Sequence, residues 1–186
     1  MITSIRKALQ VSALGLALLP VAAGADMPVA YKDGTATLFR FNAPDFWTVR
    51  AGGPRDLTAP GDAGGQGVNR VIGLQPSADP HVWMGFVSPR GVSTFQQAAD
   101  YLREVGPFLV KNVNAGEIVP TRVGGLPARK MAGTGTRNGR AVEFTAVAVD
   151  LPGPRMAVSV VVFESGANPE LVRDVNAIFA SFRAAR

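Results

Sequence analysis

The run Gly133-Thr-Gly-Thr-Arg-Asn-Gly-Arg-Ala-Val-Glu-Phe144 holds the strongest local folding signal in the chain. Its centre, Asn138-Gly139, is a dipeptide preferred in two-residue hairpin turns, because both turn positions adopt positive φ. A turn of that length sets three opposite pairs, namely Arg137 with Arg140, Gly135 with Val142 and Gly133 with Phe144. An aromatic ring opposite a strand glycine can cover the bare backbone there. The sequence therefore predicts an antiparallel hairpin with a fixed register.

Further strand-forming runs lie on both sides of this hairpin. Gly124-Gly125 marks a turn between the runs 117–123 and 128–136, and Pro152-Gly153 follows the run 141–149. The next run, 156–163, is apolar on both faces, which predicts a central strand covered on both sides. Upstream, we expect strands at 35–41, 46–50, 68–75 and 81–87. A chain of consecutive strands with turn signals between them indicates an antiparallel sheet.

Two segments carry the spacing of amphipathic helices. In the first, Ser93 is the expected N-cap and Gln96 completes a capping box. Its apolar face comprises Phe95, Ala98, Ala99, Leu102 and Val105, and Gly106-Pro107 ends or kinks it. In the second, Asn168 is the expected cap and Pro169 the first helical residue. Its apolar stripe comprises Leu171, Val172, Val175, Ile178, Phe179 and Phe182. The predicted fold class is α+β, a layered sandwich in which helices flank an antiparallel sheet.

Residues 1–25 have the pattern of a secretory signal peptide. Arg6 and Lys7 precede an apolar core of about a dozen residues, which is shorter than the ~20 residues of a membrane-spanning helix. Ala23-Gly24-Ala25 then predicts cleavage before Asp26, with an uncleaved anchor as the alternative. We therefore expect one domain over 26–186, periplasmic or secreted, without a stable transmembrane anchor.

Charge and composition narrow the possible partners. Loss of residues 1–25 lowers the count of Lys and Arg from 19 to 17, against 14 Asp and Glu. This mild excess is not the clustered basic surface of a nucleic-acid-binding protein.

The segment 51–67 holds six glycines and two prolines, which predicts a surface loop, either functional or disordered.

Three motifs resemble the PsbP-like superfamily, including the DcrB-type bacterial envelope proteins. They are Phe39-x-Phe41-x-x-Pro44-x-x-Trp47-x-Val49, Gly124-Gly125-Leu126-Pro127-Ala128, and Ile178-x-x-x-Ser181-Phe182-Arg183. The resemblance implies an antiparallel sheet flanked by helices. It also implies a binding or assembly accessory, and it carries over no catalytic residue. The lipid-attachment cysteine of DcrB-type proteins is missing here.

The residue inventory argues against most catalytic chemistry. The chain has no cysteine and one histidine, His81, so a thiol nucleophile and a His/Cys zinc site are not expected. We predict no metal, no cofactor and no catalytic residues. The alternative is a small hydrolase-like enzyme built around His81, with Asp79 and either Ser77 or Ser88 nearby in sequence.

Five residues are candidates for ligand or partner binding: Trp47, Trp83, His81, Arg137 and Arg140. The tryptophans are expected to line a pocket or else to pack in the core. The two arginines flank the hairpin turn and suit a carboxylate or phosphate partner, although solvated turns also carry such residues. The sequence thus predicts an exported, non-catalytic accessory that engages an envelope protein, an anionic surface or a small ligand.

Overall fold

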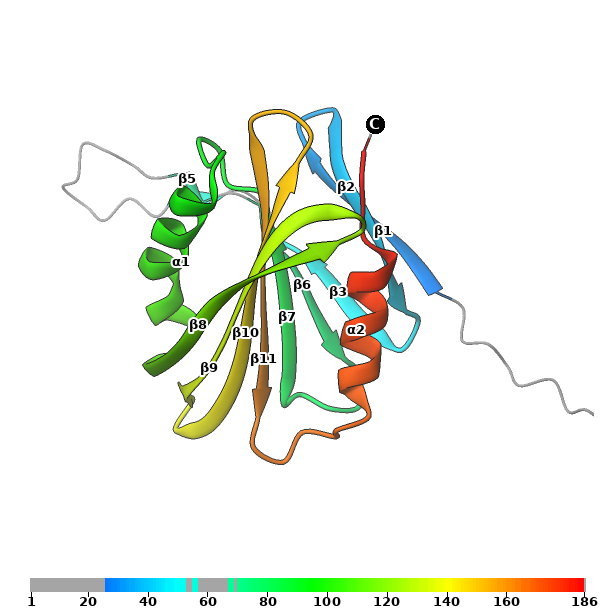
Figure 1. The fold of residues 1–186 in the computed structure, drawn as a ribbon. Helices are drawn as coiled ribbons and strands as arrows, with labels where there is room; N and C mark the ends of the chain where they lie inside the picture. Colours follow the sequence, from blue (N-terminus) through cyan, green and yellow to red (C-terminus); the bar gives the residue numbers. More distant parts are fainter. Residues whose placement is uncertain (1–25, 53–54, 57–66, 69, 186) are drawn as a thin grey trace, which may run out of the picture.

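The computed structural model describes residues 26–52, 55–56, 67–68 and 70–185. The predicted signal peptide, and most of the predicted loop at 51–67, lie outside these residues. In the described part, two antiparallel sheets and two helices form an α+β fold (Figure 1), as the sequence predicts.

The larger sheet has seven strands in the order β3-β6-β7-β11-β10-β9-β8. Their bounds are β3 Trp47–Ala51, β6 Ile72–Pro76, β7 Val82–Val87, β8 Lys111–Val123, β9 Leu126–Arg137, β10 Arg140–Leu151 and β11 Arg155–Glu164. β11 is central and mostly buried, as its apolar run predicts. β8 is a long edge strand whose first ten residues are exposed, and two register shifts interrupt its pairing with β9.

A smaller sheet packs across one face of the larger one. It has the order β1-β2-β12, with bounds β1 Asp26–Asp33, β2 Ala36–Pro44 and β12 Arg183–Ala184. β1 is absent from the sequence-based prediction. β2 also runs through Pro44, where the sequence suggested an interruption. A separate pair, β4 Arg55–Asp56 and β5 Gly67–Val68, joins the two ends of the glycine-rich segment.

The hairpin has the predicted register, with Arg137 opposite Arg140 and Gly133 opposite Phe144. The Phe144 ring covers Gly133 closely, because a Cβ on that glycine would lie 2.8 Å from the ring. Gly124, in the turn before β9, shows a second close approach. It has φ +58, and a Cβ there would lie 2.2 Å from the carbonyl oxygen of Phe182.

Both helices form, with different ends from those predicted. Helix α1 spans Phe95–Leu109, and its capping box uses Thr94 and Gln97, one residue beyond the predicted pair. Thr94 has the extended backbone of an N-cap, and the helix continues through Pro107 to Leu109. Helix α2 spans Leu171–Ser181, so Pro169 precedes the helix. Asn168 still accepts a hydrogen bond from the backbone N–H of Glu170, as a cap would.

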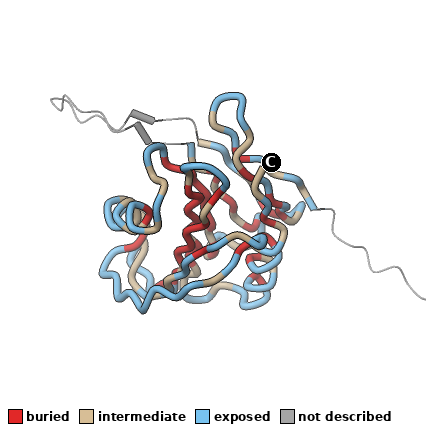
Figure 2. Tube along the Cα trace, turned by 45° about the horizontal axis from the view of Figure 1, so that its top comes forward, coloured by how far each residue is buried: buried red, intermediate tan, exposed pale blue. Residues whose placement is uncertain are grey.

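The main core lies between the larger sheet on one side and the smaller sheet with α2 on the other. Figure 2 shows buried segments gathered in the central strands, whereas α1 is mostly exposed or intermediate. Phe39, Phe41, Phe86 and Phe182 are fully buried and stack on one another, with ring centroids 4.4–6.4 Å apart. Phe179 packs against this cluster while partly exposed, and Val172 of the predicted stripe is exposed. Val172 is on the outer side of α2 because Leu171, Val175 and Ile178 take the inner side.

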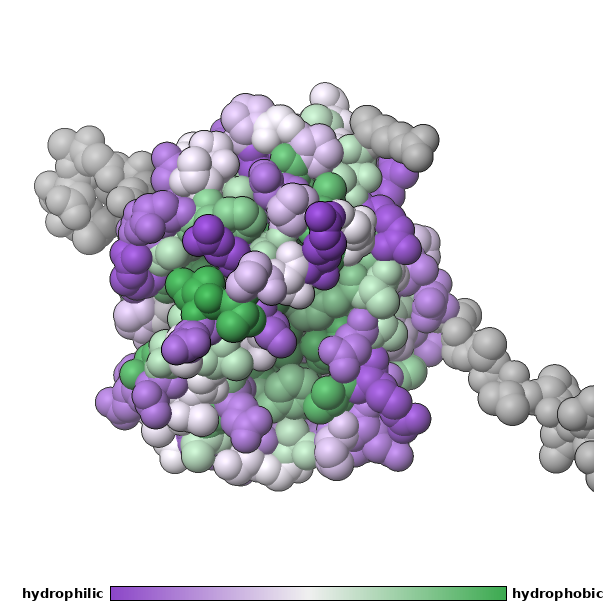
Figure 3. Space-filling view, in the orientation of Figure 1, coloured by the Kyte–Doolittle hydropathy of each residue, from purple (hydrophilic) through white to green (hydrophobic). Residues whose placement is uncertain are grey.

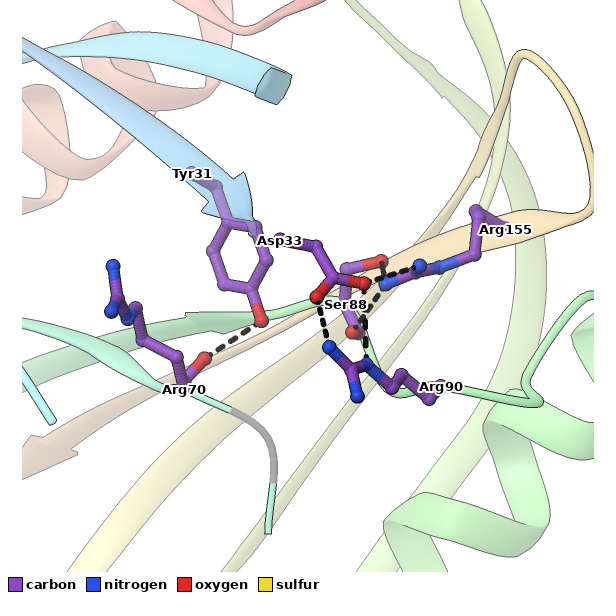
Figure 4. Close-up of polar contacts among 6 residues, drawn as sticks. All are labelled: Tyr31, Asp33, Arg70, Ser88, Arg90 and Arg155. Carbon is purple, nitrogen blue, oxygen red and sulfur yellow. Dashed lines mark hydrogen bonds and ion pairs between the residues drawn. The ribbon is translucent and has the colours of Figure 1, made fainter. Parts of the chain in front are cut away.

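A cluster of hydrogen bonds and ion pairs links the two sheets (Figure 4). Asp33, at the end of β1, accepts hydrogen bonds from Arg155 of β11 at 2.8 Å and from Arg90 at 2.6 Å. Arg155 also donates to the carbonyl oxygen of Ser88. These two arginines lower the pKa of Asp33 to about 2. Tyr31, also on β1, donates to the carbonyl oxygen of Arg70.

Candidate functional site

Helix α1 packs on the larger sheet through two buried clusters, and a groove runs along one side of it. Near its start, Ala98 packs in a buried cluster with Ala148 and Met156. Just beyond its end, Val110 packs in a second buried cluster with Phe144. Ala98 is the only buried residue within α1 itself. Phe95, Tyr101 and Leu102 pack against the first cluster and Leu109 against the second, so most inward residues of α1 are only partly buried.

A groove, which we call the α1 groove, lies between the larger sheet and one side of α1, from Phe95 to Val110. It has a volume of about 470 Å³, within the usual range of ligand sites. Small residues face each other across it, Ala99 and Gly106 on the helix and Ala146 on β10. Larger side chains form the rest of its wall: Phe95, Leu102, Leu109, Met131, Phe144 and Val160. The groove exists because these small residues cannot span the distance between helix and sheet.

Basic residues accompany this apolar wall. Arg129 of β9 lies over the ring of Phe95, with its guanidinium carbon 4.8 Å from the ring centroid. Arg103 of α1 also lines the groove and pairs with the exposed Asp100. None of the described residues that line the groove is acidic. The charged side chains that line the groove are therefore all basic, although Asp100 offsets the charge of Arg103.

Exposed hydrophobic residues flank one end of the α1 groove. Phe108 is 84% exposed, and Val113 and Ile118 of β8 are about half exposed. Figure 3 shows strongly hydrophobic residues gathered on this part of the surface, where β8 passes α1. Exposed apolar patches of this kind mark interaction sites or ligand grooves.

A second, more open cavity lies on the opposite face of the same strands. It has a volume of about 1150 Å³. Asn114, Thr134, Glu143 and Phe163 form one cross-strand row along it, from β8 to β11. Its wall mixes polar and apolar side chains and is more open to solvent, so it encloses a ligand less well than the α1 groove does.

His81 lies next to Asp79, outside both cavities. Its Nδ1 is 2.9 Å from Asp79 Oδ1, and the other carboxylate oxygen accepts from the backbone N–H of Asn168. The Asn168 bond, followed by those from His81, lowers the pKa of Asp79. In the described structure no serine hydroxyl is hydrogen-bonded to His81. The two serines nearby in sequence have other partners, Ser77 with Thr48 and Ser88 with Arg155. The hydrolase alternative requires a serine nucleophile at His81, and neither Ser77 nor Ser88 occupies that position.

None of the other sequence candidates lines the α1 groove, although Trp83 packs against the cluster of Val110 and Phe144 beside it. Trp47 is 2% exposed in the main core, which favours the packing alternative for this residue. Trp83 is partly buried, and Arg137 reaches across from the hairpin to lie 5.3 Å from its ring. Arg140 is exposed, so the two hairpin arginines differ in their surroundings. A binding role for any of these residues stays a prediction.

Two further features concern metals and membranes. Across the part of the chain that the structure describes, no three His, Asp or Glu side chains gather where they could hold a metal ion. Within the same residues, no helix is both long and apolar enough to cross a membrane.

The fold is PsbP-like. The chain is similar to the cyanobacterial PsbP protein CyanoP of Synechocystis sp. PCC 6803, with a TM-score of 0.51 and 8% sequence identity over 89% of this chain and 96% of that one. It is also similar to a protein from Bacteroides thetaiotaomicron, with a TM-score of 0.50 and 9% identity over 80% of this chain. That match covers 46% of the Bacteroides chain.

A third similar structure is LpqN of Mycobacterium tuberculosis, described as involved in cell envelope biogenesis. Its TM-score is 0.49 and its identity 17%, over 87% of this chain and 91% of LpqN. No protein-family model and no curated protein sequence matches the chain. At these identities the likeness establishes the fold alone, and the DcrB-type part of the resemblance stays a prediction.

The sequence-based candidates did not include the α1 groove. The available signal was the run of small residues on β10, where Ala146 and Ala148 alternate with larger residues on a face opposite an amphipathic helix. Alanine in a strand is compatible with close packing or with a gap, so the pattern alone does not distinguish the two.

Proposed function

We propose that this chain is an exported, non-catalytic accessory protein that binds a small apolar ligand in the α1 groove. The observation that carries the proposal is the groove itself, a largely apolar space along one side of α1. Ligand sites are typically concave and largely apolar, with a few polar groups that orient the ligand. The α1 groove has this composition, with Arg103, Arg129 and Gln96 as the polar groups.

The chemistry of the remaining sites supports a binding role over a catalytic one. The His81–Asp79 pair links the turn before β7 to the segment before α2, and among the described residues no serine hydroxyl is hydrogen-bonded to it. The polar cluster around Asp33 joins two sheets, and each of its charges has an opposite partner. Both sets of ionisable groups therefore have a structural explanation.

Filling the groove tests the proposal directly. Ala146→Leu adds a branched side chain to the groove wall and is expected to weaken binding of the neutral fluorescent probe N-phenyl-1-naphthylamine at least tenfold. Thr145→Leu is the matched control, because the neighbouring residue lines the cavity on the opposite face of β10. Fluorescence titration measures both affinities, and circular dichroism checks that both variants fold. Equal probe binding by both variants, or no binding by the wild type, would contradict the proposed function.

Export is tested separately. Expression of the full chain, followed by intact-mass analysis of the periplasmic fraction, is expected to give a protein that begins at Asp26. A full-length mass recovered with the membranes would favour the uncleaved anchor.

A further inference from the structure

The charges along the α1 groove are arranged unevenly from one end to the other. The start of α1, at Phe95 and Gln96, lies by Arg129. The end of α1, at Leu109, lies by Phe144, and the groove wall there is apolar. The α1 groove therefore has Arg129 at one end and an apolar wall at the other, with Arg103 of α1 between them.

Arg129 is the side chain best placed to act at the basic end. It pairs with Ala148, which belongs to the cluster beneath α1, so its side chain is on the α1 face of β9. Lys130, which also lines the groove, pairs with Val147 of the main core, so its side chain starts from the opposite face of β9. Contact with the Phe95 ring uses none of the five N–H donors of the guanidinium group, so they stay available to an anion.

We propose that the ligand of the α1 groove is a single-chain anionic amphiphile, with its carboxylate or phosphate monoester at Arg129 and its alkyl chain directed toward Phe144. This inference rests on the proposed function and names the class of ligand. A guanidinium group binds both kinds of head by paired N–H···O bonds, whereas a cationic head would be repelled by Arg129 and Arg103.

The volume of the groove suits a ligand with one alkyl chain better than a lipid with two. Its volume of about 470 Å³ is near the lower end of the roughly 300–1,000 Å³ range of ligand sites. The clusters of Ala98 and Val110 lie beside this space and occupy the rest of the interface between α1 and the sheet. A lipid with two chains would need more room than this volume offers.

Four probes share a twelve-carbon alkyl chain and differ in their head group. Used below their micelle concentrations, they show how much the head and the chain each contribute to the binding affinity. Dodecanoate and dodecyl phosphate are the anionic probes, dodecanol is neutral and dodecyltrimethylammonium is cationic. Each is titrated against the complex with N-phenyl-1-naphthylamine, and displacement gives its affinity. The anionic probes are expected to bind about tenfold more tightly than dodecanol, the scale of one partly exposed charged hydrogen-bonding contact.

Substitutions test whether Arg129 causes the preference for anionic head groups. Arg129→Gln is expected to bring dodecanoate affinity down to that of dodecanol, with dodecanol affinity unchanged. Arg173→Gln, on the exposed side of α2, makes the same change in net charge and is expected to keep the preference. A preference that survives Arg129→Gln would overturn the assignment of the head to Arg129.

The remaining outcomes distinguish the two proposals. If dodecanol or the cationic probe displaces the fluorescent probe as well as dodecanoate does, the anionic class is wrong and the proposed function stands. If the wild type binds neither the fluorescent probe nor any alkyl probe, the proposed function itself fails. Equally strong displacement by phosphatidylglycerol vesicles would overturn the single-chain assignment.

Discussion

The two helices cover opposite faces of the larger sheet, and they pack very differently. Helix α2 buries Leu171, Val175 and Ile178 to 7%, 6% and 0% exposure against the core beneath it. Helix α1 buries one alanine and borders a groove. Both sequences show an apolar stripe at helical spacing. The stripe thus predicts which side of a helix turns inward, and the residues opposite decide how closely it packs.

The residues opposite each helix differ in size. On the α2 side, Phe39, Phe41 and Phe86 fill the space between the sheets. On the α1 side, β10 presents alanines at positions 146 and 148. Interiors are normally packed to crystal-like density, so a face left open in an otherwise well-packed domain is a candidate for binding.

The largest expected loss of unfolding free energy follows a substitution at the end of α2. Phe182→Ala removes a ring that is fully buried among other aromatics, and it is expected to lower the free energy of unfolding by about 3–5 kcal/mol. Leu102→Ala, on the half-buried side of α1, is expected to cost about 1 kcal/mol. Urea unfolding measures both. Equal losses would mean that the two helices are packed alike.

The next effect tests how the end of α2 docks on the turn before β9. Gly124→Ala combines a positive φ with a Cβ that would lie 2.2 Å from the carbonyl oxygen of Phe182. Gly125→Ala has a positive φ, but its Cβ would meet no atom within 4 Å. Gly125→Ala is therefore expected to cost about 1 kcal/mol of unfolding free energy from backbone strain alone, and Gly124→Ala clearly more. Similar midpoints of thermal unfolding for the two variants would contradict this close approach.

A smaller effect concerns the ion pairs that hold the small sheet in place. Because the pKa of Asp33 falls from 3.8 to about 2 in the folded protein, its ionised form stabilises the fold above pH 3.8. That contribution is lost as the pH falls from 3.8 through about 2. The stability difference between the wild type and Asp33→Asn is therefore expected to be largest at neutral pH and to vanish near pH 2. Urea unfolding at several pH values measures it, and a constant difference would exclude Asp33 as its source.

The smallest effect is at the outer side of α2. Val172→Ser is expected to change the free energy of unfolding by no more than about 0.5 kcal/mol, because this side chain is 46% exposed. Val175→Ser, one turn further along, removes a buried contact and is expected to cost several times more. If the two valines proved equally sensitive, α2 would be rotated relative to the structure described above.

The sequence predicts local structure well wherever one residue type has a strong conformational preference. Asn138-Gly139 set the hairpin register, and the apolar run at 156–163 marked the central strand. β1 was missed because Asp26–Asp33 alternates between exposed and partly buried positions and buries only Tyr31, so it carries little apolar signal. The α1 groove was missed for a different reason. Its presence depends on the distance between a helix and strands that are distant in sequence, which no local pattern encodes.

The packing of α1 on the sheet has a consequence for ligand entry. The first half of α1 is packed on the sheet by the cluster around Ala98, and the residue after its end belongs to the cluster around Val110. A ligand can therefore enter the groove without disturbing either cluster only from its flank. That flank lies between α1 and the edge strand β8, where the half-exposed Val113 and Ile118 line the groove.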